Sequence, residues 1–191
     1  MRSFIAINLP DDVKAEIDAI IDRLRPAGPP ARWVPATNLH LTLKFLDEIR
    51  EDQVQPITDA IARATAGARP FEIRLGGFGV FPNERKARVF WIAIESGFDI
   101  LKPLATAMDD QLAPLGFARE ARPFSAHITL ARLREPGPAD RLVKAASHMS
   151  YRSDPIPVRE IDLMRSILSP KGAAYSVLSS VALQEPADMG L

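Results

Sequence analysis

Two short segments of the chain repeat one pattern, 87 residues apart. The first, residues 40–46, reads HLTLKFL, and the second, residues 127–133, reads HITLARL. Because side chains alternate between the two faces of a strand, each segment places its histidine and its threonine on one face. In the first segment we expect Leu41, Leu43 and Phe45 to point the other way, into a core. The pattern predicts two strands that each hold an imidazole beside a hydroxyl group.

The repeat extends beyond these two segments at the same spacing. Residues 4–7 (FIAI) correspond to residues 91–94 (WIAI), and Arg32 corresponds to Arg119. A repeat of about half the chain implies two pseudo-equivalent lobes, because a solenoid is built from several shorter units. The expected boundaries are residues 2–80 and 88–168 for the repeats, 1–184 for a single bilobal domain and 185–191 for a disordered tail.

Hydrophobic periodicity and turn residues predict strands and helices in the same order in each half. In the first helix, capped by Asp11 or Asp12, an apolar stripe runs from Val13 to Leu24. The predicted strands are residues 3–8, 40–46, 71–80, 87–95, 127–133, 158–168 and 175–183, and the predicted helices are residues 11–24, 52–66, 98–112 and 139–148. Each half contains strands and helices in alternation, which indicates an α+β duplication.

Composition restricts the class of protein. The chain has 191 residues, of which 47% are hydrophobic, enough to bury a core. It contains no apolar run long enough to span a bilayer, and its N-terminus lacks the long apolar region of a signal peptide. Without cysteine it has no disulfides and no thiolate chemistry. We expect a soluble, cytoplasmic protein, whose formal net charge of zero excludes a strong overall attraction for polyanions.

Two histidines, each beside a threonine, suit chemistry on a phosphate ester. In-line attack on a phosphodiester needs a base for the incoming oxygen and an acid for the leaving oxygen, on opposite sides of phosphorus. An ordinary histidine pKa of about 6.5 lets one imidazole be neutral while the other is protonated. Threonine hydroxyls can donate to the non-bridging oxygens, and an arginine can offset negative charge. A 2′,3′-cyclic phosphate is a natural substrate, because its strained ring needs no metal for attack by water.

Other interpretations of these residues are less favourable. A single histidine is more commonly a surface or core residue, and the repeat spacing is what favours a functional role for His40 and His127. His148 has no following threonine and is expected on a helix surface. A metal site is the main chemical alternative, but the chain has three histidines and no cysteine, and no carboxylate stands at ligand spacing near either strand. We therefore expect neither a metal nor another cofactor.

An ordered set of further motifs accompanies the two segments. They are FIAINLP at 4–10, RWVP at 32–35, NLHLTLKFL at 38–46, FGVFPN at 78–83, RPF at 122–124, HITLAR at 127–132 and SILSPKG at 166–172 before Tyr175. With them the chain resembles the 2H phosphoesterase superfamily, and within it the bacterial and archaeal RNA 2′,3′-cyclic phosphodiesterases, historically called 2′-5′ RNA ligases. The chain departs from the pattern at Asp47, where glycine is usual, and at Ala126, where proline is usual.

The resemblance implies a fold and a mechanism. The fold has two lobes around a central cleft, each an antiparallel sheet with outer helices, and each lobe supplies one His-x-Thr motif. The implied reaction is metal-free hydrolysis of a 2′,3′-cyclic phosphate at an RNA end to a 2′-phosphomonoester. His40 would donate a proton to the leaving 3′ oxygen and His127 would accept one from water, with Thr42 and Thr129 beside them. The near-symmetry of the sequence does not itself assign the two roles.

Substrate binding and the reaction's direction remain open at this point. The candidates for phosphate binding are Arg32, Lys44, Arg119, Arg122 and Arg132, the last being similar to a family arginine. The alternatives to hydrolysis are 2′-5′ ligation of RNA ends by the reverse reaction, hydrolysis of a small cyclic nucleotide, and RNA binding without catalysis. We expect a monomer whose partner is an RNA with a 2′,3′-cyclic phosphate end, tRNA fragments included, with no membrane contact.

Overall fold

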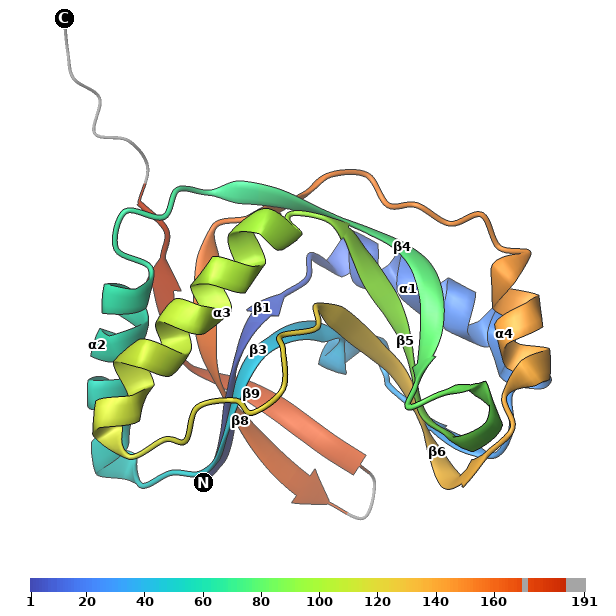
Figure 1. The fold of residues 1–191 in the computed structure, drawn as a ribbon, viewed down its shortest axis with the longest axis horizontal. Helices are drawn as coiled ribbons and strands as arrows, with labels where there is room; N and C mark the ends of the chain where they lie inside the picture. The colour runs from blue at the N-terminus through green and yellow to red at the C-terminus, as the bar shows by residue number, and fades with distance from the viewer. Residues whose placement is uncertain (170–171, 185–191) are drawn as a thin grey trace, which may run out of the picture.

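The strands form two antiparallel sheets, one in each lobe (Figure 1). The computed structural model describes residues 1–169 and 172–184. One sheet has the strand order β3-β1-β8-β9 and the other has the order β2-β6-β5-β4-β7. The strands are β1 (Arg2–Asn8), β2 (Ala31–Trp33), β3 (His40–Glu48), β4 (Phe71–Phe81), β5 (Ala87–Ser96), β6 (His127–Gly137), β7 (Ile156–Val158), β8 (Glu160–Ser169) and β9 (Gly172–Ala182). The helices are α1 (Asp11–Leu24), α2 (Val54–Ala64), α3 (Phe98–Leu112) and α4 (Asp140–Ser147).

The predicted α+β class with two antiparallel lobes is confirmed, with local differences. The predicted strand at 158–168 is divided, because Val158 pairs with Phe71 in the second sheet while β8 starts at Glu160 in the first. The short strand β2 was not predicted. The predicted tail at 185–191 and residues 170–171 of the last motif lie outside the described residues. No helix in the described ranges combines the length and apolar character needed to cross a membrane.

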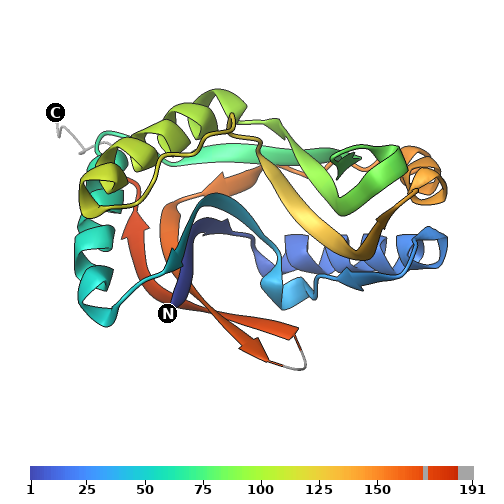
Figure 2. The same ribbon diagram turned by 60° about the horizontal axis from the view of Figure 1, so that its bottom comes forward.

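Helices cover one face of each sheet and leave the other face free. Helices α2 and α3 pack together on the first sheet, and α1 and α4 lie on the second (Figures 1 and 2). The predicted stripe of α1 is buried at Ile17, Ile20 and Leu24. Each such side chain contributes roughly 1.5–3 kcal/mol of burial free energy. The site residues must therefore project from the opposite, helix-free faces.

Each lobe draws on both halves of the sequence. Strand β1 of the first half has β8 of the second half on its far edge, and β5 of the second half is paired with β4 of the first. Likewise α1, which follows β1, lies in the second lobe, and α3, which follows β5, lies in the first (Figure 2). The lobes are therefore interleaved and do not correspond to the two halves of the chain.

The strand pairing around the second motif is shifted by two residues relative to the pairing around the first motif. Ala6 lies opposite Thr42, whereas Trp91 lies opposite Thr129. In the repeat, however, Trp91 corresponds to Phe4. The bulky indole therefore stands directly opposite Thr129, whereas the residue opposite Thr42 is an alanine.

A bulge in β3 reverses the expected alternation after Thr42. Ala6 pairs with Thr42 but Ile5 pairs with Lys44, which leaves Leu43 as an extra residue. Lys44 is consequently turned inward and is 3% exposed, while Phe45 is 58% exposed. The prediction that Phe45 points into the core is wrong for this reason.

The same irregularity occurs at the equivalent place in β6. Trp91 pairs with Thr129 but Phe90 pairs with Ala131, so Leu130 is the extra residue. Leu130 and Ala131 are both buried, and Arg132 is exposed. Strict alternation would turn Arg132 toward the core, and the bulge instead returns it to the face of His127 and Thr129.

Candidate active site

His40 begins β3 and is held at both ring nitrogens. Its Nδ1 lies 2.7 Å from the carbonyl oxygen of Asn38, and its Nε2 lies 3.0 Å from Oγ1 of Thr42. Because a carbonyl oxygen only accepts, Nδ1 carries the proton, and Nε2 of the neutral ring is an acceptor for the threonine hydroxyl. Asn38 is fixed in turn, since its side-chain amide donates to the carbonyl of Ala173 at 2.6 Å.

His127 begins β6 and makes the same backbone contact through Nδ1. Its Nδ1 lies 2.7 Å from the carbonyl oxygen of Ser125, again two residues earlier in the chain. The proton is therefore on Nδ1 in both histidines, which leaves both Nε2 atoms as the reactive nitrogens. Sequence reasoning missed these carbonyl partners, because backbone contacts leave no residue-type signal.

Aromatic rings enclose each imidazole. The ring of His40 lies 4.7 Å from Phe4 and 5.2 Å from Tyr175, measured between centroids. The ring of His127 lies 5.1 Å from Phe81 and 6.1 Å from Trp91. These contacts partly bury both histidines and restrict the orientation of their rings.

Trp91 occupies a position that only glycine on the neighbouring strand permits. Gly79 lies opposite Trp91 in the register of β4 and β5, and a Cβ atom added at Gly79 would come 2.3 Å from Cζ2 of the indole. The indole Nε1 is buried without a hydrogen-bond partner in the described part of the chain. The indole is thus packed against the strand beside His127.

Burial lowers the pKa of both imidazoles from the ordinary histidine value, because the charged form loses hydration. The backbone hydrogen bonds at Nδ1 raise both pKa values in part. The positive charge of Arg132 lowers the pKa of both His40 and His127, and that of Lys14 also lowers the pKa of His40. One guanidinium group therefore lies within electrostatic reach of two histidines that belong to different sheets.

Two of the predicted arginines lie side by side. Arg32 on β2 is directly opposite Arg132 on β6, and both side chains are exposed. Like charges in directly opposed positions destabilise a sheet, and an anion between them removes that cost. The pair thus places two positive charges at one spot on the surface of the second sheet. Arg122 is exposed in the loop before β6.

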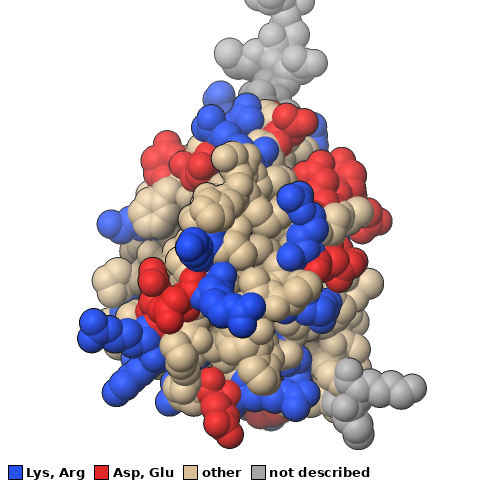
Figure 3. Space-filling model, turned by 90° about the vertical axis from the view of Figure 1, so that its right-hand side faces the viewer, with Lys and Arg blue, Asp and Glu red and all other residues tan. Residues whose placement is uncertain are grey.

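Lys44 and Arg119 are engaged elsewhere. Nζ of Lys44 lies 2.5 Å from Oδ1 of Asp109 on α3, and Arg119 forms an ion pair with Asp110 of the same helix. Neither side chain is brought to the histidines by these contacts. Charges of both signs are mixed on the end of the molecule that Figure 3 shows, so that face carries no continuous basic surface.

The arrangement has the components of acid and base chemistry on a phosphate ester. Two imidazoles present Nε2 atoms, Thr42 supplies a hydroxyl beside His40, and Thr129 lies on the face of His127. Within residues 1–169 and 172–184, no three His, Cys, Asp or Glu side chains form a group that could hold a metal ion.

The comparisons with known proteins agree with this chemistry. The family model described as LigT-like phosphoesterase matches the chain twice, at residues 7–91 and 92–175, so each match contains one His-x-Thr motif. A protein of Thermotoga maritima named RNA 2′,3′-cyclic phosphodiesterase is 33% identical over 178 residues, 93% of this chain and 93% of the relative. A protein of the same name from Methanothermobacter thermautotrophicus is 31% identical over 92% of this chain and 95% of its own length.

Solved structures give the same result. LigT of E. coli, in a crystal structure with 3′-AMP, is 27% identical with a TM-score of 0.74, covering 96% of this chain and 98% of that one. The protein TT0787 of Thermus thermophilus is 33% identical with a TM-score of 0.72 at the same coverage. These similarities confirm the resemblance drawn from the sequence motifs. The chain belongs to the LigT-like phosphoesterase family, a branch of the 2H phosphoesterases.

Proposed function

We propose that the protein hydrolyses 2′,3′-cyclic phosphate ends of RNA to 2′-phosphomonoesters, by metal-free catalysis with two histidines. The observation that carries the proposal is the matched pair of imidazoles, each with Nδ1 bound to a backbone carbonyl and both near Arg132. The names of the relatives in Thermotoga and Methanothermobacter support RNA as the substrate.

In the proposed mechanism His127 accepts the proton of the attacking water and His40 protonates the leaving 3′ oxygen. The Thr42 hydroxyl is placed at Nε2 of His40, where it can turn to a non-bridging oxygen when a phosphate binds. Thr129 has the equivalent position in the second motif, two residues after His127, and Arg132 offsets the negative charge that develops on phosphorus oxygens.

Phosphate binding also prepares the acid. In the free protein burial and Arg132 lower the pKa of His40, so its protonated form is scarce near neutral pH. A bound phosphate carries negative charge, which offsets Arg132 and favours the imidazolium form. His40 thus becomes a competent proton donor when the substrate is in place.

The test is incubation with an oligonucleotide that ends in a 2′,3′-cyclic phosphate, followed by identification of the product. We expect a 2′-phosphomonoester, and undiminished activity in a strong chelator. Recovery of a 3′-phosphomonoester, or abolition by chelation, would contradict the mechanism. If the protein prefers a mononucleoside cyclic phosphate to the oligonucleotide, its substrate is a small cyclic nucleotide and not RNA. If it joins the oligonucleotide to an RNA with a 5′-hydroxyl end, the net reaction is ligation.

We further propose that the protein works as a monomer in the cytoplasm, with tRNA fragments among its substrates. Size-exclusion chromatography with light scattering tests the first point. A mass of twice 21.0 kDa would overturn it.

A further inference from the structure

The loop that leads into the second motif crosses from one lobe to the other. It follows α3 of the first lobe and a short 3-10 turn, Ala113–Leu115, and reaches β6 in the second lobe at His127 (Figure 1). Residues 118–123 of this loop are exposed, so few packing contacts define its path. Long connections without regular structure are commonly functional when something fixes them.

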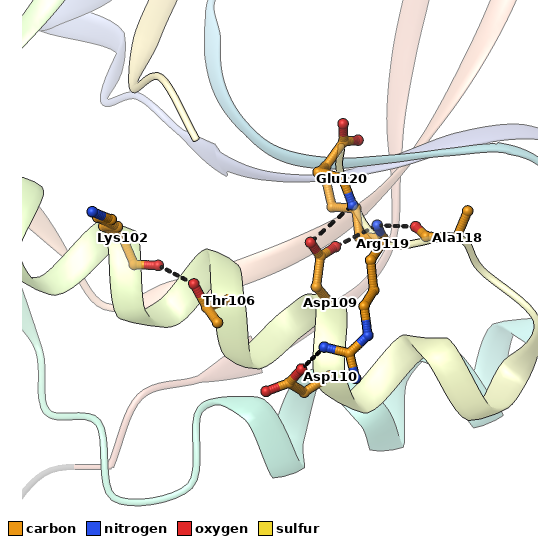
Figure 4. Close-up of polar contacts among 8 residues, drawn as sticks. Lys102, Thr106, Asp109, Asp110, Ala118, Arg119 and Glu120 are labelled. Atoms are coloured by element: carbon orange, nitrogen blue, oxygen red, sulfur yellow. Dashed lines mark hydrogen bonds and ion pairs between the residues drawn. The ribbon is translucent and has the colours of Figure 1, made fainter. Parts of the chain in front are cut away.

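Lys44 fixes this loop from the strand of the first motif. Its Nζ donates to Oδ1 of Asp109 at 2.5 Å and to the carbonyl oxygen of Ala118 at 2.7 Å. The other carboxylate oxygen of Asp109 accepts from the backbone N–H of Glu120 at 3.0 Å. Figure 4 shows Asp109, Ala118 and Glu120 gathered at the end of α3. We call Lys44, Asp109 and their two backbone contacts the lysine clasp.

The clasp holds an ion pair that is largely removed from solvent. The Lys44 side chain is only 2% exposed to solvent, and that of Asp109 is 17% exposed. A buried ion pair commonly adds no net stability relative to apolar residues of similar volume. What the charged pair supplies, and an apolar pair would not, is the hydrogen bonding to residues 118 and 120.

Beyond the clasp, the loop contacts α3 at Arg119, in an exposed ion pair with Asp110, and at Phe124. The ring of Phe124 stacks on Phe98, with centroids 6.3 Å apart, and such a pair is worth about 0.5–1.5 kcal/mol. Ser125, whose carbonyl oxygen fixes Nδ1 of His127, follows at once. The loop is therefore held at its start by the first motif's strand and joined at its end to the second motif's histidine.

We propose that Lys44 is a positioning residue, which through the lysine clasp fixes the loop that sets the ring orientation and tautomer of His127. Lys44 would thus act on the reaction without touching the substrate. The inference rests on the proposed function for its kinetic effect, but the state of the His127 ring can be measured without turnover.

The experiment compares three variants with the wild type. K44M breaks the clasp and leaves Asp109 unpaired, so it can lose stability. K44M/D109L removes both charges and supplies an apolar pair, which should keep the melting temperature near that of the wild type. D110N is the matched control, because Asp110 lies beside Asp109 on α3 but forms only an exposed ion pair with Arg119.

We expect K44M/D109L to fold, to lose at least tenfold in kcat and to change KM by less than threefold. A displacement of about 1 Å in a catalytic group can account for such a loss. In ¹⁵N NMR spectra, His127 should change from the Nδ1–H tautomer to a mixture, while His40 and His148 are unchanged. D110N should match the wild type in every measurement.

A K44M/D109L protein with wild-type kcat and an unchanged His127 tautomer would overturn the proposal. An activity loss that only follows the melting temperature across the variants, with His127 unchanged, would also overturn it and leave Lys44 a structural residue. If the wild type fails to hydrolyse cyclic phosphates, the proposed function fails, and the NMR result still decides the role of Lys44.

Discussion

Gly79→Ala should slow catalysis through Trp91. The new Cβ would lie 2.3 Å from Cζ2 of the indole, whereas ordinary carbon contacts begin near 3.4 Å, so the ring must move by about 1 Å. Its neighbours on the site face are Phe81, with ring centroids 4.9 Å apart, and His127 at 6.1 Å. Overpacking of this kind costs about 1–3 kcal/mol in the free energy of unfolding. A shift transmitted to His127 should lower kcat by about 10–100-fold.

Urea unfolding and steady-state hydrolysis of a cyclic phosphate measure the two effects. Gly137→Ala on β6 is the matched control, because its Cβ would meet only the Glu135 carbonyl oxygen, at 3.9 Å. The double variant G79A/W91F should regain stability, since a phenyl ring leaves room for the new methyl group and removes an unpaired buried N–H. Wild-type kcat in a folded, destabilised Gly79→Ala protein would refute the link between Trp91 and His127.

Four further predictions concern the pH profile, the two catalytic histidines, the salt dependence of binding and the backbone at Asp47. Because burial and Arg132 lower the pKa of both His40 and His127, kcat/KM should be bell-shaped in pH, with both limbs below about pH 6.5. Activity falls on the acid side as the base is protonated and on the alkaline side as the acid loses its proton, and an optimum well above pH 7 would contradict the assignment. His40→Ala and His127→Ala should each lower kcat by at least about 10²-fold, and the double variant should lose little more, as single-turnover rates will show. The dependence of log affinity on log salt should have a slope of about 0.7 per phosphate contacted, and a steep slope would indicate a long RNA footprint. Asp47 has a φ of 54°, a left-handed conformation that costs less for the glycine usual in the family. The Asp47→Gly variant should therefore melt about 2 °C higher in calorimetry, with its activity unchanged.

Local patterns predicted most of the elements and the pairing of each histidine with a threonine. The stripe of α1 and the apolar runs of the strands are visible in the sequence because burial selects residue types. The directions of the Lys44 and Phe45 side chains could not be predicted, because one extra residue at Leu43 reverses the alternation at the residues that follow it. The backbone partners of the imidazoles, at Asn38 and Ser125, also lie outside any residue-type pattern.

The arrangement of the lobes could not be predicted for a different reason. The duplication shows that two similar units exist, but it does not show which strand joins which sheet. That choice depends on contacts between distant residues, such as the pairing of Ser3 with Arg165 in the first sheet. A duplicated sequence with separate lobes would have the same local periodicity.

Interleaving makes the two lobes one unit of unfolding. If the chain were cut in the exposed turn at residues 82–86, the N-terminal fragment would keep β1 and β3 without β8, and α1 without most of the sheet that it covers. Neither fragment could bury its apolar faces alone, so the two should fold only together, as a complex of half-chains. In the intact protein, heat or denaturant should therefore disrupt the structure around His40 and around His127 in a single cooperative transition.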